Sequence, residues 1–195
     1  MPSATRPYRM QARAAAVEEA TERILDAAEE LFWNNPARPV TLAELASKAG
    51  VSVHSIIRRF GGQAGVYEAT AARSVERVGA QRNDADPSDL EQVVRVLVEH
   101  YEQFGDRALA LIAAEQASPT VKDLADVGRL CHVDWCERMF FATLAERRGA
   151  DRRRRLAQLI AVCDVYTWLL LRRQRGLSRR ETERAITEML EPLVA

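Results

Sequence analysis

The sequence predicts an all-α fold of about nine helices, in which a helix-turn-helix unit near the N-terminus is followed by a larger helical part. Valine and isoleucine do not alternate with polar residues over any useful length, as they would in half-buried strands. Several segments instead repeat apolar residues every three or four positions, which is the spacing of one helix face. Hydrophobic residues make up 47% of the 195-residue chain, so we expect a packed core.

Charge is balanced over the whole chain but unevenly distributed along it. Lysine and arginine number 28, as do aspartate and glutamate, so the formal net charge is zero. Residues 1–17 carry Arg6, Arg9 and Arg13 and no acid, and arginine is dense again between residues 147 and 184. A polyanion would therefore meet particular faces of the protein rather than a uniformly basic body.

Several classes of protein are not indicated by the sequence. No apolar run reaches transmembrane length, and the N-terminus lacks the apolar core of a signal peptide. Three cysteines, Cys131, Cys136 and Cys163, do not make a disulfide framework, so we expect a cytoplasmic protein with reduced thiols. No G-x-S-x-G, phosphate-binding loop or H-E-x-x-H motif occurs, and we expect neither catalytic residues nor a cofactor.

The first predicted helix covers residues 17–34 and follows a basic arm, residues 1–15, that we expect to be flexible. Its apolar stripe consists of Ile24, Leu25, Ala28, Leu31 and Phe32. Asparagine at positions 34 and 35 and proline at position 36 end it.

Two short helices follow, and each has a recognisable cap. Thr41 precedes LAELASKA with Glu44 three residues on, which is a capping box. Gly50 ends that helix, and Ser52 offers the N-cap of the next one, over residues 53–60. Two glycines at positions 61 and 62 end this third helix.

The remaining helices fall on either side of an acidic, proline-containing segment, NDADPS at residues 83–88, which we take as a domain boundary. We expect further helices over residues 63–81, 89–104, 106–116, 120–148, 151–176 and 178–193. Domains are therefore expected as an arm (1–15), a helix-turn-helix domain (16–62), a connecting helix (63–82) and a second domain (83–195).

The two short helices and their A-G-V-S turn form a helix-turn-helix pattern. Val51, Ile56 and Phe60 lie where they can anchor the second helix on a core. The other face of that helix then presents His54, Ser55, Arg58 and Arg59. Such a helix fits the DNA major groove, where polar side chains meet base edges and cations meet phosphates. The alternative without a DNA-binding role is an ordinary helical hairpin whose basic end is exposed to solvent.

Longer motifs favour the DNA-binding interpretation. ILDAAEELFWNN, VTLAELASKAGVS and HSIIRRFGGQAGVYEA, in this order between about Ala16 and Ala72, resemble the N-terminal domain of the TetR family of transcriptional regulators. The resemblance implies a homodimer that binds a palindromic operator, most often as a repressor, and is released by a small apolar effector. Residues 166–194 resemble the closing helix pair of many members, which implies dimerisation through the C-terminal helices, about 151–195.

The chain departs from the family pattern at the reading helix. Where members often have Ser-Lys-Gly-Thr-Leu-Tyr, residues 52–57 read SVHSII, so that Val53 and Ile57 replace a lysine and a tyrosine that often contact DNA. We expect DNA contacts from Thr41, Lys48, Val53, His54, Ser55, Arg58 and Arg59. The arm is expected to be a solvated tail, with insertion into the minor groove as the alternative.

Aromatic and other large side chains in the second domain suggest an effector site, since such residues line most ligand pockets. We expect a double-stranded DNA partner and an unknown small-molecule effector. The expected effector-binding residues are Tyr101, Phe104, Ile112, His132, Trp135, Met139 and Tyr166. For any single one of them, ordinary core or dimer packing is the competing interpretation.

The segment CHVDWC at residues 131–136 contains potential zinc ligands. Cys131 and Cys136 are five residues apart, or about 140° around a helix axis, so they do not point at one ion together. We therefore expect no metal site. Two rival functions remain at this stage: a helical small-molecule-binding protein or enzyme with an incidental basic hairpin, and a scaffold that binds a partner through its C-terminal helices.

Overall fold

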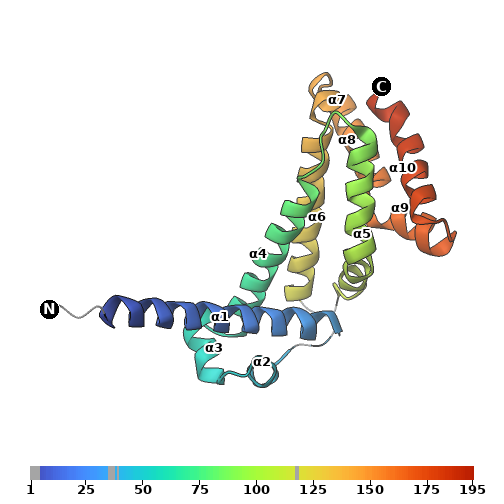
Figure 1. Cartoon of the computed structure of the whole chain (residues 1–195). Coiled ribbons are helices and arrows are strands. Elements are labelled where there is room, and N and C mark those ends of the chain that lie inside the picture. The colour runs from blue at the N-terminus through green and yellow to red at the C-terminus, as the bar shows by residue number, and fades with distance from the viewer. Residues whose placement is uncertain (1–4, 35–37, 39, 117–118) are drawn as a thin grey trace. The chain divides into compact units, whose positions relative to one another are not determined.

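The computed structural model describes residues 5–34, 38, 40–116 and 119–195, with side chains from residue 15 onward except at 33, 34 and 120. Every regular element in these ranges is a helix, which confirms the predicted all-α class (Figure 1). One compact unit ends at Ser74, and a second runs from Val75 to Ala195. The elements are α1 (Thr5–Asn34), α2 (Leu42–Ala49), α3 (Val53–Phe60), α4 (Gln63–Arg82), α5 (Leu90–Ala113), α6 (Pro119–Met139), α7 (Phe141–Ala145), α8 (Gly149–Val162), α9 (Val165–Trp168), a π-helix η1 (Leu169–Gln174) and α10 (Arg179–Val194).

The N-terminal unit packs α2 and α3 against α1 and the start of α4. Its core is formed by Ile24, Ala27, Ala28, Val40, Leu45, Ala46, Ala49, Ile56 and Val66. The predicted caps are confirmed. The hydroxyl of Thr41 accepts a hydrogen bond from the backbone N–H of Glu44 (3.2 Å), and the Glu44 carboxylate accepts one from the Thr41 N–H (2.9 Å). Gly50 then adopts φ 65°, which residues with a side chain rarely adopt, so α2 ends there.

A partly exposed ion-pair cluster joins α4 to α1. The guanidinium of Arg73 lies 2.9 Å from carboxylate oxygens of Glu22 and Asp26 and 3.0 Å from Glu29. These three acids are spaced three and four residues apart on α1, so they share one face, and one cation reduces the repulsion among them. Arg73 thus fixes the orientation of α4 within the N-terminal unit.

The first helix begins earlier than predicted, because α1 starts at Thr5 and includes residues that the sequence assigns to the arm. Pro7 lies in the first turn, where a missing N–H costs no intrahelical hydrogen bond. The following residues, MQARAAA, are strong helix formers and contain no breaker. The side chains of Arg6, Arg9 and Arg13 lie outside the described residues.

The C-terminal unit is a bundle in which α5 packs against α6, α9 and α10, while α8 packs against α6 and α10 (Figure 1). Its core contains two fully buried tryptophans, Trp135 from α6 and Trp168 from α9. Leu97, Leu159 and Leu190, also fully buried, extend this core through α5, α8 and α10. Within the described ranges, no helix is both long enough and apolar enough to cross a bilayer.

The predicted division of residues 89–116 into two helices is wrong, since α5 continues through Gly105. Gly105 is buried, and a Cβ built on it would lie 2.6 Å from Cζ3 of Trp168. The glycine therefore makes room for a tryptophan on another helix and does not break its own.

Two other predicted long helices are interrupted. The helix expected over 120–148 divides at Phe140 into α6 and α7, and the one expected over 151–176 divides at Cys163 into α8, α9 and η1. At the second break, the Asp164 carboxylate accepts a hydrogen bond from the Tyr166 N–H at 2.9 Å, which caps a new helix. Neither break contains glycine or proline, so the sequence carried no strong signal for them.

Candidate DNA-binding surface and a buried polar cluster

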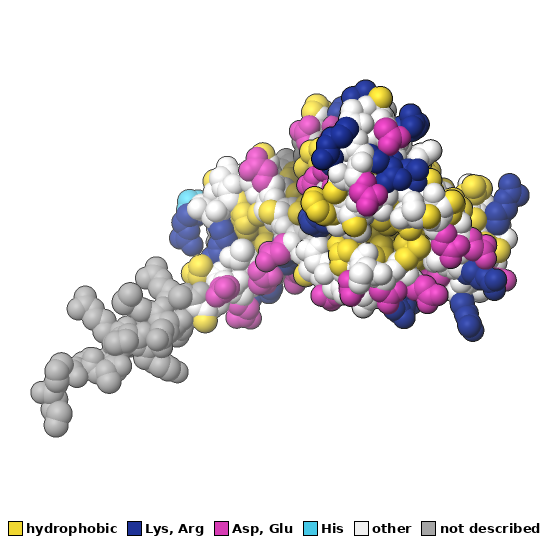
Figure 2. Space-filling view, turned by 90° about the horizontal axis from the view of Figure 1, so that it is seen from above, with side chains coloured by type: hydrophobic (Ala, Val, Ile, Leu, Met, Phe, Trp, Pro, Cys, Tyr) yellow, Lys and Arg dark blue, Asp and Glu magenta, His cyan; other side chains and the backbone are white. Residues whose placement is uncertain are grey.

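The third helix is held by one face and exposed on the other. Ile56 is fully buried in the N-terminal core, and Val51 and Phe60 pack partly buried against it, as predicted. On the opposite face His54 and Arg58 are exposed, and Ile57 is 45% exposed. We call these three residues the reading face. Figure 2 shows a histidine and basic side chains together on one edge of the N-terminal unit.

Arg59 differs from its neighbour Arg58. Its guanidinium donates to the backbone carbonyl of Val17 and to the hydroxyl of Thr21, both on α1. The side chain is half-buried and holds the last turn of α3 on α1. The structure therefore separates the two arginines into an exposed one and a positioning one.

The other predicted DNA contacts lie at the ends of α2 and α3, and most already have partners. Lys48 lies 2.6 Å from the carboxylate of Glu30, and the hydroxyls of Ser52 and Ser55 lie 2.8 Å apart. Thr41 is exposed, with its hydroxyl donating to Glu44. Val53 is partly buried against the core.

Glu44 gives the start of α2 a fixed negative charge. Its carboxylate accepts a hydrogen bond from Arg38 at 2.8 Å as well as from Thr41. The bond from Arg38, followed by those from Thr41, lowers the pKa of Glu44 from 4.5 to about 2. The cap therefore remains ionised throughout the physiological range.

Two side chains of α4, not identified from the sequence, position the segment that leads into α2. The side-chain amide of Gln63 donates to the carbonyl of Val40 at 2.7 Å, and the hydroxyl of Tyr67 accepts from the Val40 N–H at 3.1 Å. Both backbone groups of Val40 are thereby satisfied. The sequence contains no sign of this role, because a glutamine at the start of a helix is ordinarily exposed to solvent.

The predicted effector-binding residues divide between core and surface. Tyr101, His132, Trp135 and Met139 are buried together in the C-terminal core or at its edge. Phe104 and Ile112 are half-buried on α5. Tyr166 does not join them, because it is 54% exposed on α9.

Tyr101 is engaged inside the core. Its hydroxyl donates a hydrogen bond to the backbone carbonyl of Cys163 at 2.9 Å. Burial raises the pKa of Tyr101 well above its ordinary value, so the side chain is neutral at physiological pH. It also lies at the point where α8 ends, and the bond satisfies a carbonyl left free by that ending.

Arg82, the last residue of α4, is buried in the C-terminal unit with only 5% of its surface exposed. One of its terminal nitrogens lies 3.3 Å from Nδ1 of His132, and its guanidinium carbon lies 4.1 Å from the centre of the Trp135 ring. Its backbone carbonyl accepts from the Trp135 indole N–H at 3.1 Å. Its Nε has no hydrogen-bond partner in the described structure, and burial lowers its pKa.

His100 is a second buried and incompletely bonded group in the same region. It is 7% exposed, and its Nδ1 has no hydrogen-bond partner among the described atoms. Burial, followed by the nearby Arg82 and His132, lowers the pKa of His100 from 6.5 to about 3. The imidazole is therefore neutral at pH 7, and one of its two nitrogens carries a proton that it can donate.

Two cysteines complete this region. Cys136 and Cys163 are fully buried, and the sulfur of Cys136 lies 3.8 Å from Nε2 of His132. A hydrogen bond from Cys163, with smaller contributions from His132 and Arg82, lowers the pKa of Cys136 below its ordinary value. We call Arg82, His100, His132 and Cys136 the Arg82 cluster.

Sequence reasoning found His132 but missed Arg82 and His100. A basic residue in the last turn of a helix is ordinarily a solvated cation that favours the helix dipole, so Arg82 gave no signal. Across the part of the chain that is described, no group of three or more His, Cys, Asp or Glu side chains is placed to hold a metal ion.

Known proteins provide an independent comparison. The family model described as bacterial regulatory proteins, tetR family, matches residues 24–70, which run from within α1 into α4. A search of curated proteins found no match to the chain.

Solved structures resemble the chain over most of its length. A candidate fatty acid metabolism regulator from Clostridium perfringens is 15% identical with a TM-score of 0.62, and the match covers 89% of this chain and 98% of that one. NalD, the secondary repressor of the MexAB-OprM multidrug efflux pump in Pseudomonas aeruginosa, is 18% identical with a TM-score of 0.56, over 91% and 96%. A candidate transcriptional regulator from Saccharomonospora viridis, in complex with choline, is 19% identical with a TM-score of 0.60, over 89% and 96%.

These sequence identities are low, so the solved structures establish only the fold. The family model adds a sequence match, and that match is confined to the N-terminal unit. The match spans the capped α2, the turn at Gly50 and the reading face of α3. Residues 24–70 therefore match the tetR family of bacterial regulatory proteins, and the matched segment holds the helix-turn-helix formed by α2 and α3.

Proposed function

We propose that the protein is a ligand-responsive repressor that binds a palindromic operator as a homodimer and is released by a small, largely apolar effector. The observation that carries the proposal is the reading face, an exposed strip on a short helix whose opposite side is anchored by the fully buried Ile56. NalD, which has a similar fold, is a repressor, and the similar Saccharomonospora viridis protein was solved with choline. The first similarity supports a repressor role, and the second supports the binding of a small molecule.

On DNA, the reading face divides into a polar and an apolar part. His54 and Arg58 are exposed and have the donors that meet base edges or phosphates in the major groove. Ile57, exposed at 45%, matches the apolar contact that thymine methyl groups accept. Arg59 acts as a positioning residue through its bonds to α1. We assign phosphate contacts to Lys48 and Thr41, at the end and the start of α2.

We expect Arg58→Ala to weaken operator binding by about 1–3 kcal/mol, the usual worth of a specific arginine contact to a base. The change removes an exposed side chain and no described packing contact, so the free energy of unfolding should change little. The operator is first selected from a random duplex library with the wild-type protein, and affinity is then measured by fluorescence anisotropy over a series of salt concentrations. If Arg58 contacts phosphate instead, the log–log salt slope falls by about 0.9.

Arg95→Ala is the matched control, since it removes one exposed arginine from α5 in the C-terminal unit. It should leave both affinity and salt slope unchanged. If the Arg58→Ala variant bound the operator with wild-type affinity, the assignment of α3 as the helix that contacts DNA would be wrong. If the selection enriched no DNA sequence with the wild-type protein, the proposal that the protein is a repressor would be contradicted.

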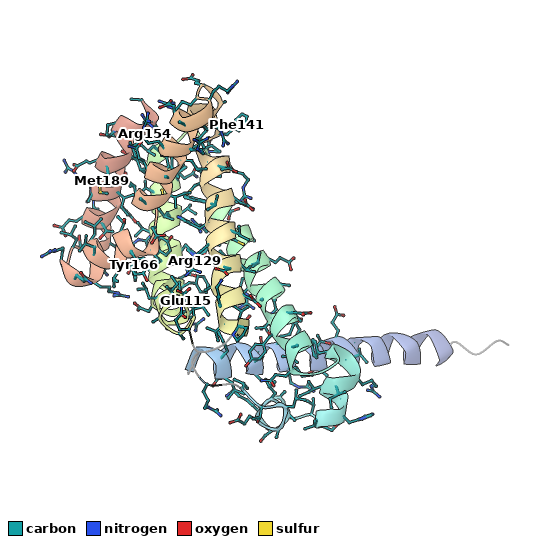
Figure 3. The ribbon with its side chains drawn as sticks, turned by 180° about the vertical axis from the view of Figure 1, so that it is seen from behind. Glu115, Arg129, Phe141, Arg154, Tyr166 and Met189 are labelled. Carbon is teal, nitrogen blue, oxygen red and sulfur yellow. The ribbon has the colours of Figure 1, made fainter. Side chains whose placement is uncertain are left out.

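The proposed dimer uses the C-terminal helices, about residues 151–195. Three large apolar side chains lie exposed there: Tyr166 at 54%, Leu170 at 43% and Met189 at 40%. Tyr166 and Met189 lie on the α8–α10 side of the C-terminal unit (Figure 3). Exposed apolar groups that cluster on one side mark protein interfaces, and a palindromic operator requires two copies related by a two-fold axis.

We expect Met189→Arg to shift the protein toward monomers, because a charge at a two-fold interface is buried twice, once in each subunit. Sedimentation velocity over a range of micromolar concentrations measures the change. Leu130→Arg on α6, where Leu130 is 64% exposed, is the control and should sediment as the wild type does. Wild-type protein that remains monomeric at these concentrations would contradict the proposed geometry.

A further inference from the structure

The Arg82 cluster places a cation in the core without an opposing carboxylate. Only 5% of the surface of Arg82 is exposed. No aspartate or glutamate of the described residues forms an ion pair with it. Its contacts are a histidine nitrogen and an indole ring, and its Nε–H is left without an acceptor. Burying a charge in this way costs several kcal/mol unless a partner of opposite charge is supplied.

The free groups of the cluster suit an anion with two oxygens. In a guanidinium, Nε–H and the neighbouring terminal N–H point the same way and match the two oxygens of a carboxylate. In Arg82 the Nε–H is unpartnered, and the neighbouring terminal nitrogen contacts Nδ1 of His132 at 3.3 Å, a contact that a bidentate carboxylate would share or replace. His100 is also buried in the C-terminal unit, and its own Nδ1 is unpartnered. The C-terminal unit thus holds two buried polar side chains with an unsatisfied nitrogen, Arg82 from the end of α4 and His100 from α5.

The surroundings of the cluster are apolar and aromatic. Trp135 lies against the guanidinium, while the rings of Tyr101 and Phe104 lie 5.2 and 5.4 Å from that of His100. A ligand that reaches Arg82 would separate these side chains, so its own body must be apolar to restore the contacts that they lose. A small hydrophilic anion would lose its hydration without this compensation.

We propose that Arg82, assisted by His100 and His132, binds the carboxylate group of an effector whose body is apolar. The inference rests on the proposed ligand-responsive function and adds the chemical class of the ligand. Arg82 is also the last residue of α4, and its carbonyl is bonded to Trp135 of α6. A carboxylate at Arg82 therefore acts on the end of the same helix whose first residue, Gln63, positions the entry to α2.

An internal counter-charge is the competing explanation. The sulfur of Cys136 lies 3.8 Å from Nε2 of His132, and its pKa is lowered, which favours the thiolate form. If that thiolate balances Arg82, no carboxylate is needed and none should bind preferentially. The two explanations thus predict opposite responses to added carboxylates.

The test compares carboxylates with uncharged molecules of the same shape. Thermal unfolding of the purified full chain is followed at pH 7.5 with decanoate against decanamide and with 1-naphthoate against 1-naphthamide, which covers a flexible and a flat body. We expect the carboxylate of at least one pair to raise Tm by several degrees more than its amide. Equal shifts within both pairs would overturn the proposal.

Variants then assign the effect to Arg82. Arg82→Met should abolish the preference for the carboxylate while leaving the ligand-free Tm unchanged or higher, because an uncompensated buried charge is removed. Arg138→Met is the control, since Arg138 is exposed and hydrogen-bonds Asn83 at 2.9 Å in the same part of the unit, and it should keep the preference. A preference that survives in Arg82→Met overturns the assignment.

The thiolate explanation has its own signature. If Cys136 supplies the counter-charge, Cys136→Ala should lower the ligand-free Tm, and wild-type protein should not distinguish carboxylate from amide. If Arg82→Met does not fold, Arg82→Lys keeps the charge but loses the planar fork, and we expect at least a tenfold weaker carboxylate affinity by calorimetry. Wild-type affinity in Arg82→Lys would contradict recognition through the fork.

Operator release separates this inference from the proposed function. Addition of the preferred carboxylate to the protein–operator complex should release DNA from the wild type but not from Arg82→Met. If the wild type binds no operator yet still prefers the carboxylate, the binding site stands and the repressor proposal fails. If operator is bound but neither carboxylate is preferred, the repressor proposal stands and the carboxylate site fails.

Discussion

Gly65→Ala is expected to destabilise the N-terminal unit by about 3 kcal/mol, at the upper end of what overpacking costs. Gly65 lies in the first turn of α4, and a Cβ built on it would overlap the carbonyl oxygen of Phe60 and lie 2.9 Å from the carbonyl carbon. These are backbone atoms, so no side-chain rotation relieves the overlap. Relief requires α3 to move away from α4, which disturbs the packing of Ile56 and with it the reading face.

Gly79→Ala is the matched control within the same helix. Nothing lies within 4 Å of a Cβ built on Gly79, and its φ is not positive. Replacing a helix-interior glycine with alanine should therefore stabilise by about 0.5–1 kcal/mol. Urea unfolding of the full chain, followed by circular dichroism, measures both changes. If Gly65→Ala is as stable as Gly79→Ala, the close approach of α4 to α3 is wrong.

Alanine is expected to change the free energy of unfolding in opposite directions at these two glycines, and the sequence alone does not distinguish them. It does predict the features that depend on neighbouring residues. The capping box at Thr41, the turn at Gly50 and the cap at Ser52 act within a few residues, and the sequence predicted α2 and α3 to their ends. The anchoring of Ile56 followed from helical spacing alone. Local chemistry therefore accounts for most of the helix-turn-helix in the N-terminal unit.

The C-terminal unit depends on contacts between residues far apart in sequence, and there the predictions fail. Gly105 read as a helix break because its partner, Trp168, lies on another helix. Tyr166 read as an effector-binding residue because aromatics favour pockets, yet the cap at Asp164 turns α9 so that Tyr166 is exposed and Trp168 is buried. Periodicity could not supply the orientation of a helix of four residues.

Arg59 and Arg82 show the same limit for charged residues. Arginine in a short basic helix suggested a DNA contact, but the bonds of Arg59 to Val17 and Thr21 depend on how α1 crosses α3. Arginine at a helix end suggested a solvated cation, but Arg82 is buried and contacts His132 and Trp135 of α6. In both cases tertiary packing, which one sequence does not reveal, decides whether the charge meets solvent.

Trp168→Ala is expected to cost about 3–5 kcal/mol of the free energy of unfolding, as removal of a large buried aromatic does. The ring is fully buried, packs on Gly105 and lies 6.0 Å from the ring of Tyr101. Its indole N–H donates to the Glu102 carboxylate at 3.0 Å. Gly105, which lies directly against the ring, has no side chain that could move into the cavity.

Trp168→Phe separates the ring from its hydrogen bond. Phenylalanine retains most of the apolar volume, while Glu102 loses one donor but keeps Arg172, whose Nε lies 2.9 Å away. We expect a loss of about 1–3 kcal/mol, smaller than that of the alanine variant. Leu130→Ala, at a side chain 64% exposed, is the control and should change stability by less than about 0.5 kcal/mol.

The same substitution tests whether core packing and dimerisation are linked. Trp168 anchors the short α9, which also carries Tyr166, and η1, which carries Leu170. If these exposed side chains form the dimer surface, loosening their anchor should weaken the dimer in Trp168→Ala at temperatures where the monomer is still folded. Sedimentation velocity at 10 °C, combined with circular dichroism of the same samples, measures both properties. A folded Trp168→Ala protein that dimerises as strongly as the wild type would place the interface away from α9 and η1, because those elements cannot keep their geometry once the indole is gone.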